Sequence, residues 1–394
     1  MQEGYKQTEI GVIPEDWVCV AAKHLMKIET GSRNTEHKTD IGKYPFFVRS
    51  QKVERIDTYH YDCEAVLTAG DGVGTGKVFH HYIGKFDAHQ RVYVMSNFDG
   101  ITGRYFYNYF SENFGNEVSK YTAKSSVDSV RRDMIAEMLI PTPTILEQER
   151  IAEALWDVDS MISSLEKLIA KKKAVKQGAM QELLTGKKRL PGFDGDIKYK
   201  SLASLCTVFA DGDWIESKDQ SNDGIRLIQT GNIGVGKYLD KTDKQRFIST
   251  DTFDRLKCLE IFENDVIVSR LPEPAGRACI LPFSNKRRIT AVDCTIIRFA
   301  GYNPILFVAY SQTKQYQDKV DMAMAGSTRQ RISRKELGEI QIPVFPTIEE
   351  QNALASIFSE MDSEIEALEQ KLEKTRQIKQ GMMQQLLTGK IRLV

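Results

Sequence analysis

Residues 144–190 read TILEQERIAEALWDVDSMISSLEKLIAKKKAVKQGAMQELLTGKKRL, and residues 347–393 read TIEEQNALASIFSEMDSEIEALEQKLEKTRQIKQGMMQQLLTGKIRL. The two stretches align without a gap, and both end in the pattern KQGxMQxLLTGKxRL. A match of this length does not arise by chance, so the chain contains an internal duplication. A period of about 200 residues is too long for a solenoid of short repeats. We interpret the duplicated unit as a globular domain followed by a long helix.

Both stretches have apolar residues at the first and fourth positions of a seven-residue repeat for about three heptads, which is the pattern of a coiled coil. Pro143 and Pro346 precede the stretches, and Gly186 and Gly389 lie near their ends. These residues predict two helices of about 40 residues, each about 60 Å long. The predicted seam consists of Ile151, Leu155, Val158, Ile162, Leu165 and Ile169 in the first helix, and Leu354, Phe358, Met361, Ile365, Leu368 and Leu372 in the second.

Because the two seams are equivalent, we expect the helices to form an intramolecular antiparallel coiled coil that relates the two halves by a pseudo-two-fold axis. The alternative is that each helix packs only on its own globular domain. The predicted division is a first globular domain over residues 1–143, a first helix over 144–190, a second globular domain over 191–346 and a second helix over 347–394.

The globular regions have the sequence pattern of mixed, strand-rich domains. Short apolar or alternating runs between turn signals predict strands, and runs with apolar residues three or four apart predict helices. The predicted strands are 44–51, 65–69, 77–82, 91–96, 225–230, 265–270 and 295–299, and the predicted helices are 105–114 and 304–315. The expected fold class is α+β.

The composition of the chain argues against several classes of protein. The chain has 394 residues with 54 basic and 54 acidic side chains, so a purely electrostatic binder of nucleic acid or membranes is not expected. No stretch approaches the ~18 apolar residues of a membrane span. Six scattered cysteines without a CxxC pair indicate free thiols in a reducing cytoplasm.

The sequence contains no pattern typical of a catalytic, metal or cofactor site. Residues 70–77 are rich in glycine, but Asp71 and Val78 stand where a phosphate-binding loop needs Gly and Ser or Thr. We expect a turn between two strands there; a loop that contacts the DNA backbone is the alternative. All six histidines lie in the first quarter of the chain without ligand spacing. We therefore predict a non-catalytic protein without metal or cofactor.

Several motifs resemble those of specificity subunits of type I restriction–modification enzymes. They are the opening YKQTEIGVIPEDW at residues 5–17, the two Ile-Pro…Glu-Gln helix entries, the two KQGxMQxLLTGK tails, and residues 211–214 with 229–234. The resemblance spans essentially the whole chain. It implies that each globular domain is a target-recognition domain that reads one half of a bipartite double-stranded DNA sequence, and that the helices set the spacer. It also implies two methylating subunits and further restriction and translocase subunits as partners, in a prokaryotic cytoplasm.

Two other classes of function compete with this interpretation. A duplicated adaptor would bring together two copies of a partner protein without reading DNA sequence. A methyltransferase or nuclease is disfavoured because the corresponding motifs are missing.

Candidate DNA-binding residues follow from side-chain chemistry. Lys and Arg bind phosphates, and Arg, Asn, Gln, Ser and Thr on loops read base edges. In the first domain the candidates are Arg33, Asn34, Arg49, Gln51, Lys77, Gln90, Arg91, Lys120 and Lys124. In the second domain they are Trp214, Gln229, Asn232, Arg270, Arg277, Arg287, Arg288, Arg329, Gln330 and Arg331. The basic run Lys171, Lys172, Lys173 and Lys176 is interpreted as a solvated stripe, with contact to DNA or a partner as the alternatives.

Overall fold

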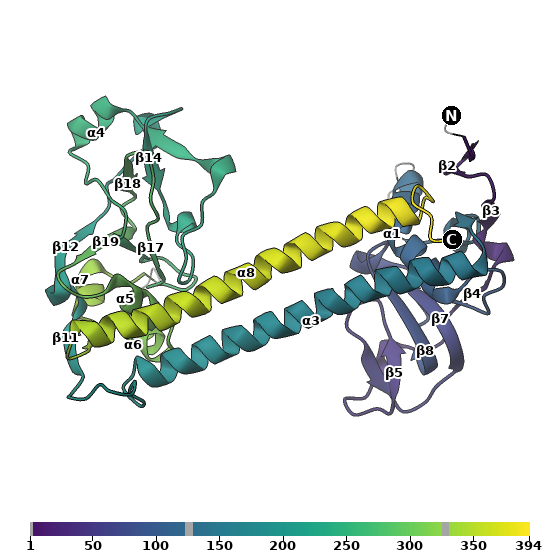
Figure 1. The fold of residues 1–394 in the computed structure, drawn as a ribbon, viewed down its shortest axis with the longest axis horizontal. Helices are drawn as coiled ribbons and strands as arrows, with labels where there is room; N and C mark the ends of the chain where they lie inside the picture. The colour runs from purple at the N-terminus through teal and green to yellow at the C-terminus, as the bar shows by residue number, and fades with distance from the viewer. Residues whose placement is uncertain (1–2, 123–128, 325–330) are drawn as a thin grey trace. The chain divides into compact units, whose positions relative to one another are not determined.

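The structure is a computed structural model that describes residues 3–122, 129–324 and 331–394 (Figure 1). Its internal contacts divide the chain into two units, Met1–Glu166 with Gln370–Val394, and Lys167–Glu369. Each unit therefore contains one globular region and one half of each long helix. Both globular regions mix strands and helices, as the sequence predicts.

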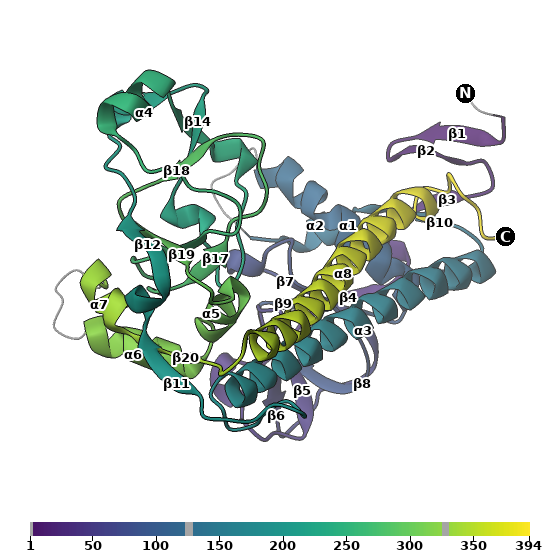
Figure 2. The same cartoon turned by 60° about the vertical axis from the view of Figure 1, so that its left-hand side comes forward.

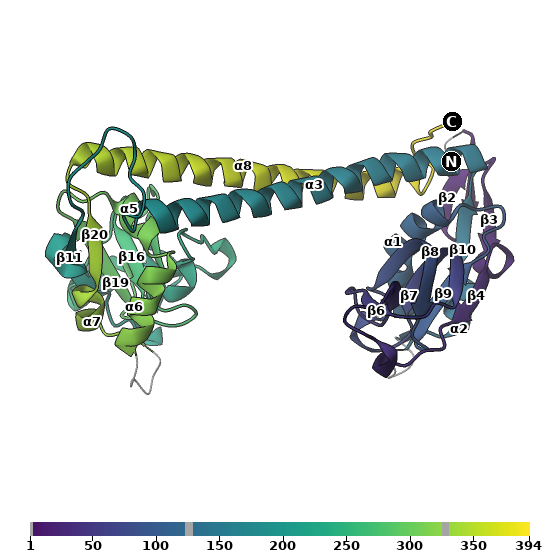
Figure 3. The same cartoon turned by 90° about the horizontal axis from the view of Figure 1, so that it is seen from below.

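A six-stranded sheet forms the centre of the first unit. Its order is β4-β9-β7-β8-β5-β6, and only the β5–β8 pair within it is parallel. Figure 3 shows β7, β8 and β9 in this sheet. The sheet strands are β4 (Lys27–Thr30), β5 (Tyr44–Phe47), β6 (Glu54–Ile56), β7 (Tyr61–Ala69), β8 (Phe79–Ala88) and β9 (Val92–Ser96). Around them lie β1 (Tyr5–Thr8), β2 (Gly11–Pro14), β3 (Val18–Ala21), β10 (Leu139–Thr142), α1 (Gly103–Thr122) and α2 (Arg132–Ala136), with the short turns η1 (Ala22–His24), η2 (Thr35–His37) and η3 (Gly72–Gly74).

Helix α1 packs on this sheet through an aromatic row. Phe106 stacks on Phe110, and Phe110 stacks on Phe114, with ring centroids 5.0 and 4.4 Å apart. All three are fully buried in one core with Val66 and Met95 of the sheet. The same core includes residues from the beginning of the first long helix and the end of the second, so these helix ends are part of the fold of the first unit.

The second unit has two four-stranded sheets, with orders β12-β19-β16-β17 and β13-β15-β14-β18. The strands are β12 (Cys206–Asp211), β13 (Gln220–Ser221), β14 (Ile225–Ile228), β15 (Arg246–Ile248), β16 (Val266–Ser269), β17 (Ala278–Ile280), β18 (Arg288–Thr290) and β19 (Cys294–Phe299), while β11 (Lys198–Ser201) pairs with β20 (Gln341–Val344). The helices are α4 (Thr250–Leu256), α5 (Pro304–Tyr310), α6 (Lys314–Met324) and α7 (Arg334–Glu339), with the short turns η4 (Leu202–Leu205), η5 (Ser217–Asp219), η6 (Thr230–Asn232) and η7 (Thr242–Lys244).

The duplication is visible in the strand pairing. The parallel pair β5–β8 of the first unit corresponds to the parallel pair β14–β18 of the second. Gly31 and Gly212 are also equivalent, because each packs on the last residue of the second strand of its parallel pair. A Cβ on Gly31 would lie 2.1 Å from the carbonyl oxygen of Ala88, and one on Gly212 would lie 2.3 Å from that of Thr290. Both positions require glycine because no side chain fits beside the neighbouring backbone.

The two repeated stretches form α3 (Ile145–Leu183) and α8 (Ile348–Leu386), each of 39 residues. The helices end at Leu183 and Leu386, seven and eight residues before the boundaries drawn from the sequence at 190 and 394. Gly186 and Gly389 follow with φ of +75° and +69°, the left-handed conformation with which glycine commonly terminates helices.

Within each unit the segments of α3 and α8 lie side by side and run in opposite directions (Figure 1). In the first unit, Asp159 pairs with Lys379 and Glu166 with Arg376, each at 2.7 Å. In the second unit Lys172 pairs with Glu364 and Lys173 with Glu369, each at 2.6 Å, and Lys176 pairs with Asp362. The alternative that each helix packs only on its own globular domain is therefore wrong. The interpretation of the basic run as a solvated stripe holds for Lys172 and Lys173, which are 36% and 56% exposed in their ion pairs, but not for Lys176, which is only 10% exposed.

The expected seam residues face inward in both helices. Eight of them are less than 10% exposed: Ile151, Leu155, Leu165, Ile169, Leu354, Phe358, Ile365 and Leu372. The remaining four, Val158, Ile162, Met361 and Leu368, are half-buried.

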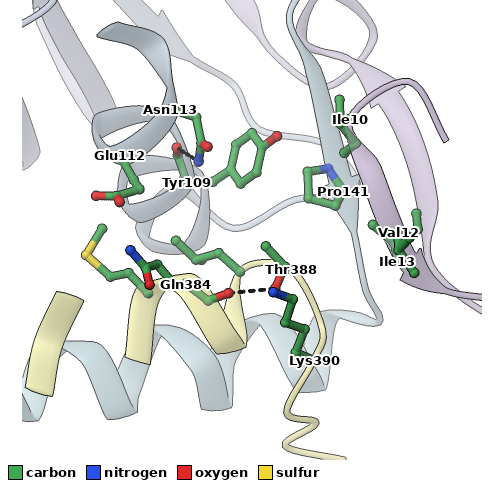
Figure 4. Close-up of a pocket in the computed structure, with 12 residues that line it drawn as sticks. Ile10, Val12, Ile13, Tyr109, Glu112, Asn113, Pro141, Gln384, Thr388 and Lys390 are labelled. Carbon is green, nitrogen blue, oxygen red and sulfur yellow. Dashed lines mark hydrogen bonds between the residues drawn. The ribbon is translucent and has the colours of Figure 1, made fainter. Parts of the chain in front are cut away.

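The hairpin of β1 and β2 lies against the C-terminal end of α8 (Figure 2). The Tyr5 hydroxyl donates a hydrogen bond of 3.0 Å to the carbonyl oxygen of Gly389. A hollow of about 270 Å³ remains between the hairpin, α1 and α8, lined by residues that include Val12, Tyr109 and Met383 (Figure 4). In the described part of the chain, no helix combines the length and apolar character needed to cross a membrane.

Candidate nucleic-acid interface

In the first unit three loops meet beyond the end of β7, and they carry predicted DNA-binding residues. Arg49 follows β5, Asp71 follows β7, and Arg91 lies in the turn between β8 and β9. The Arg49 guanidinium donates a hydrogen bond of 2.8 Å to Asp71 Oδ1, and Arg91 Nη1 lies 3.3 Å from Asp71 Oδ2. One carboxylate thus binds two arginines that are more than 40 residues apart in the sequence.

The glycine-rich segment of residues 70–77 connects β7 to β8, as the turn interpretation predicts. Gly72 and Gly76 have φ of +75° and +64°, which few other residues adopt. At Gly74 a Cβ would lie 2.5 Å from the carbonyl oxygen of Arg49, so this loop packs directly on the segment that carries Arg49.

Arg33 is brought to the same turn by backbone pairing. Its carbonyl oxygen accepts a 2.9 Å hydrogen bond from the amide of Gln90, and Arg33 forms an isolated parallel bridge with His89. Its Nε donates to the buried carboxylate of Asp87 at 3.0 Å. The backbone of Arg33 therefore lies beside the turn that carries Gln90 and Arg91, while its guanidinium binds Asp87 and, at 3.3 Å, the hydroxyl of Thr58.

The other first-domain candidates have different settings. Gln51 and Lys77 are exposed on the adjoining loops. The backbone of Asn34 begins η2, and its amide donates to Nδ1 of His37 at 3.0 Å. Lys120 belongs to the last turns of α1, and Lys124 lies outside the described residues.

His89 lies buried beneath the arginine pair. Its Nδ1 accepts a 3.0 Å hydrogen bond from the backbone amide of Arg91, which requires an unprotonated Nδ1. Burial is the main cause that lowers the pKa of His89 below 6.5; the charges of Arg49 and Arg91 lower it further, and Asp71 opposes them. A neutral His89 thus holds the turn that presents Arg91.

We expect the thermal stability of the first unit to fall as the pH is lowered from about 7 to about 5. The pKa of His89 is lower in the folded state, so the unfolded state binds its proton first as the pH falls through 6.5, and folding is penalised below that value. Melting curves at both pH values test this. In His89→Asn the amide oxygen can accept the same hydrogen bond without titrating, so the pH dependence should shrink. Some should persist, because burial also lowers the pKa of His80. An unchanged pH dependence in the variant would contradict the role given to His89.

In the second unit, Trp214 and Arg287 are the accessible candidates with defined partners. Trp214 is 70% exposed and follows Asp213, whose carboxylate accepts a hydrogen bond of 3.1 Å from the Leu259 amide. Burial raises the pKa of Asp213. Arg287 makes hydrogen bonds of 2.8–3.1 Å to Glu260 and lies over the ring of Phe253. Gln229 is half-buried at the start of η6.

Three second-domain predictions are corrected because the side chains are buried. Asn232 is 7% exposed and closes a turn, where its oxygen accepts from the Gln229 amide and its nitrogen donates to the Leu239 carbonyl. Arg270 and Arg288 are 2% and 5% exposed, and burial lowers the pKa of both. None of the three presents its polar group to a ligand on the surface.

Arg277 is a fourth correction. Its guanidinium donates hydrogen bonds of 2.7–3.0 Å to four backbone carbonyls, those of Ile233, Leu271, Pro274 and Thr230. An arginine occupied in this way ties residues 230–233 to the loop of residues 271–277, so it has a structural role.

The second unit also has an arginine–carboxylate network at the end of β16, the strand that corresponds to β7. Arg331 pairs with Asp293 at 2.7 Å, and the buried Arg270 lies 3.3 Å from Asp211. Arg334, which was not among the predicted residues, lies 3.9 Å from Asp211. A hollow of about 680 Å³ is lined by residues that include Asp211, Arg270, Arg331 and Arg334. Arg329 and Gln330, the other members of the predicted cluster, lie outside the described residues.

The equivalence of the two networks follows from the backbone. In the first unit the amide of Val130 donates to the carbonyl of Gly70, and in the second the amide of Ile332 donates to that of Arg270. Among the described residues no group of three or more His, Cys, Asp or Glu side chains could hold a metal ion.

Two similar units, each with a mixed globular region and an arginine–carboxylate network at the same strand end, define a duplicated two-domain protein. The chain belongs to the family described as "Type I restriction modification DNA specificity domain", whose model matches it twice, over residues 14–177 and 195–377. Each match spans one globular region and most of the helix that follows it. The resemblance noted in the sequence is thereby confirmed.

Individual relatives agree with this assignment. The MjaVIII specificity subunit of a type I restriction enzyme from Methanocaldococcus jannaschii is 22% identical over 422 residues, covering 100% of this chain and 97% of the relative. The EcoDI specificity subunit from Escherichia coli is 30% identical over 167 residues, covering 42% of this chain and 36% of the relative. The crystal structure of a type I restriction-modification S subunit from M. genitalium has the same fold, with a TM-score of 0.65, 16% identity, and coverage of 98% of this chain and 99% of that one.

Proposed function

We propose that this chain is the DNA-binding specificity subunit of a type I restriction–modification enzyme, and that each globular region reads one half of a bipartite double-stranded target. The observation that carries the proposal is that Arg49 and Arg91 converge on Asp71 at the end of β7, in a chain of this family. Arginine is the side chain most often used to read guanine in the major groove. The network of Arg331 at the end of β16 supplies the matching surface of the second unit.

We propose further that α3 and α8 form one antiparallel coiled coil with pseudo-two-fold symmetry, and that its length sets the spacer between the two half-sequences. The inward-facing seam and the ion pairs within each unit support this role. A paired helix is stiff, whereas a flexible linker would allow a range of spacers.

The remaining parts of the proposal follow from the family. The chain is a non-catalytic subunit that needs no cofactor, and it assembles with two methylating subunits and, in the full enzyme, with restriction and translocase subunits. It acts on DNA in the cytoplasm of a prokaryotic cell. Its balanced charge is compatible with DNA binding in such an assembly, because the partner subunits can supply part of the attraction to phosphates.

Sequencing of methylated sites in DNA treated with this chain and its methylating partners tests the proposal. We expect two short defined sequences separated by a fixed spacer of any composition. Trp214→Ala should relax base preference in one half only, by about tenfold, because a single base contact contributes about 1–3 kcal/mol. Arg55→Ala, on an arginine that binds the backbone carbonyls of Gly42 and Lys43 in the first unit, serves as a control that should not alter the half affected by Trp214→Ala. Methylation without sequence preference would favour the adaptor function.

A further inference from the structure

Asp71 is the common anchor of two arginines whose guanidinium groups still reach solvent. Its carboxylate is 22% exposed, while the side chains of Arg49 and Arg91 are 48% and 63% exposed. Its backbone is held in an antiparallel bridge with Ser129, so the anchor itself is fixed. Each guanidinium has five N–H donors, and the carboxylate engages only part of them.

The loop around this group lies close to Arg49 but leaves its side chain 48% exposed. A Cβ on Gly72 would lie 3.9 Å from Arg49 Nη1, and Gly72 has a positive φ. The loop and the segment after β5 enclose a hollow of about 410 Å³, lined by residues that include Val48, Arg49, Asp71 and Gly74. A flat, hydrogen-bonding group can therefore approach the guanidinium from the side of the hollow.

The charge and geometry of this cluster suit a base edge better than a phosphate. Two guanidinium groups and one carboxylate carry a net charge of only +1. A guanidinium fork can bind a phosphate or a base edge through two hydrogen bonds, but affinity for phosphates grows with accumulated positive charge, whereas a base edge is read by hydrogen-bond geometry. Among the bases, guanine presents two neighbouring acceptors, N7 and O6, in the major groove.

We propose that Arg49 and Arg91 read guanine in the half-sequence recognised by the first unit, and that Asp71 is a positioning residue that orients their guanidinium groups. This proposal rests on the proposed function. Asp71 does not contact DNA in this arrangement. It sets base preference through the two arginines, so its removal should alter specificity more than affinity.

The test uses the chain assembled with its methylating subunits and a DNA library randomised at the target. In Asp71→Asn the side chain keeps its size and loses its charge. We expect preference for guanine at one or two positions of a single half-sequence to fall about tenfold or more. Binding to non-specific DNA should stay equal or strengthen, because the cluster gains one positive charge. A merely structural role would weaken both.

Asp62→Asn is the matched control, because Asp62 lies near the other end of β7 and its exposed carboxylate is 3.9 Å from Lys85. This variant should keep the wild-type base profile. Arg49→Lys provides a second route if Asp71→Asn does not fold: it retains the charge but loses the planar fork, so guanine preference should fall while the salt dependence of binding is preserved.

The outcomes separate the two proposals. If the wild-type assembly selects no bipartite sequence, the proposed function itself fails. If the wild type selects a bipartite sequence but Asp71→Asn, or Arg49→Lys in its place, keeps the same base profile, the role of Asp71 is overturned. A uniform loss of binding to all sequences, at unchanged base profile, would mean that the arginines contact phosphates and would overturn it as well.

Discussion

Deletion of residues 163–169 from α3 together with residues 370–376 from α8 is expected to reduce methylation of the original target at least 100-fold and to select a shorter spacer. Each deletion removes one heptad, which is about 10 Å of helix, or about three base-pair steps at 3.4 Å each. The two half-sequences of the original target would then lie too far apart for simultaneous binding. Sequencing of methylated sites measures the new spacer directly.

The two deleted segments are chosen to preserve the pairing of the helices. The ion pairs Asp159–Lys379 in the first unit and Lys173–Glu369 in the second both remain, and whole heptads keep the seam on the same face. Deletion of residues 163–169 alone is the control, because it shifts one seam against the other and should abolish assembly altogether. If the double deletion methylates the original target at the original rate, the helices do not determine the spacer.

The long helices could be predicted from the sequence because their signal is local and occurs twice. The heptad pattern and the flanking prolines predicted the start of α3 and of α8 to within one residue, and their ends to within eight. The same pattern predicted which side of each helix faces inward. Strand positions were predicted where apolar runs are bounded by turns, as for β9 and β16. Strand lengths were not: β7 begins at Tyr61, four residues before the predicted run, because pairing with β8 continues beyond the apolar residues.

The candidate site could be predicted only in part. Residue type selected Arg49 and Arg91, but their shared partner Asp71 follows from the meeting of three loops that no local pattern specifies. Arg270 and Arg288 were selected for the same reason, but both are buried. The Arg270 guanidinium donates to the Val292 carbonyl at 2.6 Å and lies 3.3 Å from Asp211, and these contacts offset part of the desolvation that arginine usually avoids. Parallel pairing such as β5–β8 joins distant segments, so it also lies beyond a local pattern.

Replacement of Glu147 by Ala is expected to destabilise the first unit strongly, because a buried ion pair is broken. Glu147 is 1% exposed at the start of α3, and both of its oxygens accept hydrogen bonds from Arg392, at 2.6 and 2.8 Å. Its Oε2 also accepts from the indole of the buried Trp17 at 3.1 Å. The substitution therefore leaves a buried donor without its acceptor and removes the tie between the start of α3 and the end of the chain.

We expect Glu147→Ala to lower the free energy of unfolding of the first unit by about 3 kcal/mol, the low end for a broken buried ion pair, because Arg392 keeps some contact with water. Denaturation followed by Trp17 fluorescence, with Trp156 and Trp214 replaced by Phe, measures it. Asp16→Ala is the matched control: Asp16 binds the same guanidinium but is 57% exposed, so its loss should cost about 1 kcal/mol or less. Glu147→Gln, which can still accept from Trp17, should fall between them. Equal losses for Glu147→Ala and Asp16→Ala would mean that the buried contact adds nothing beyond a surface ion pair.

The equivalent pair Glu350–Arg189 ties the same two positions of the repeat in the second unit, so the same order of effects is expected there.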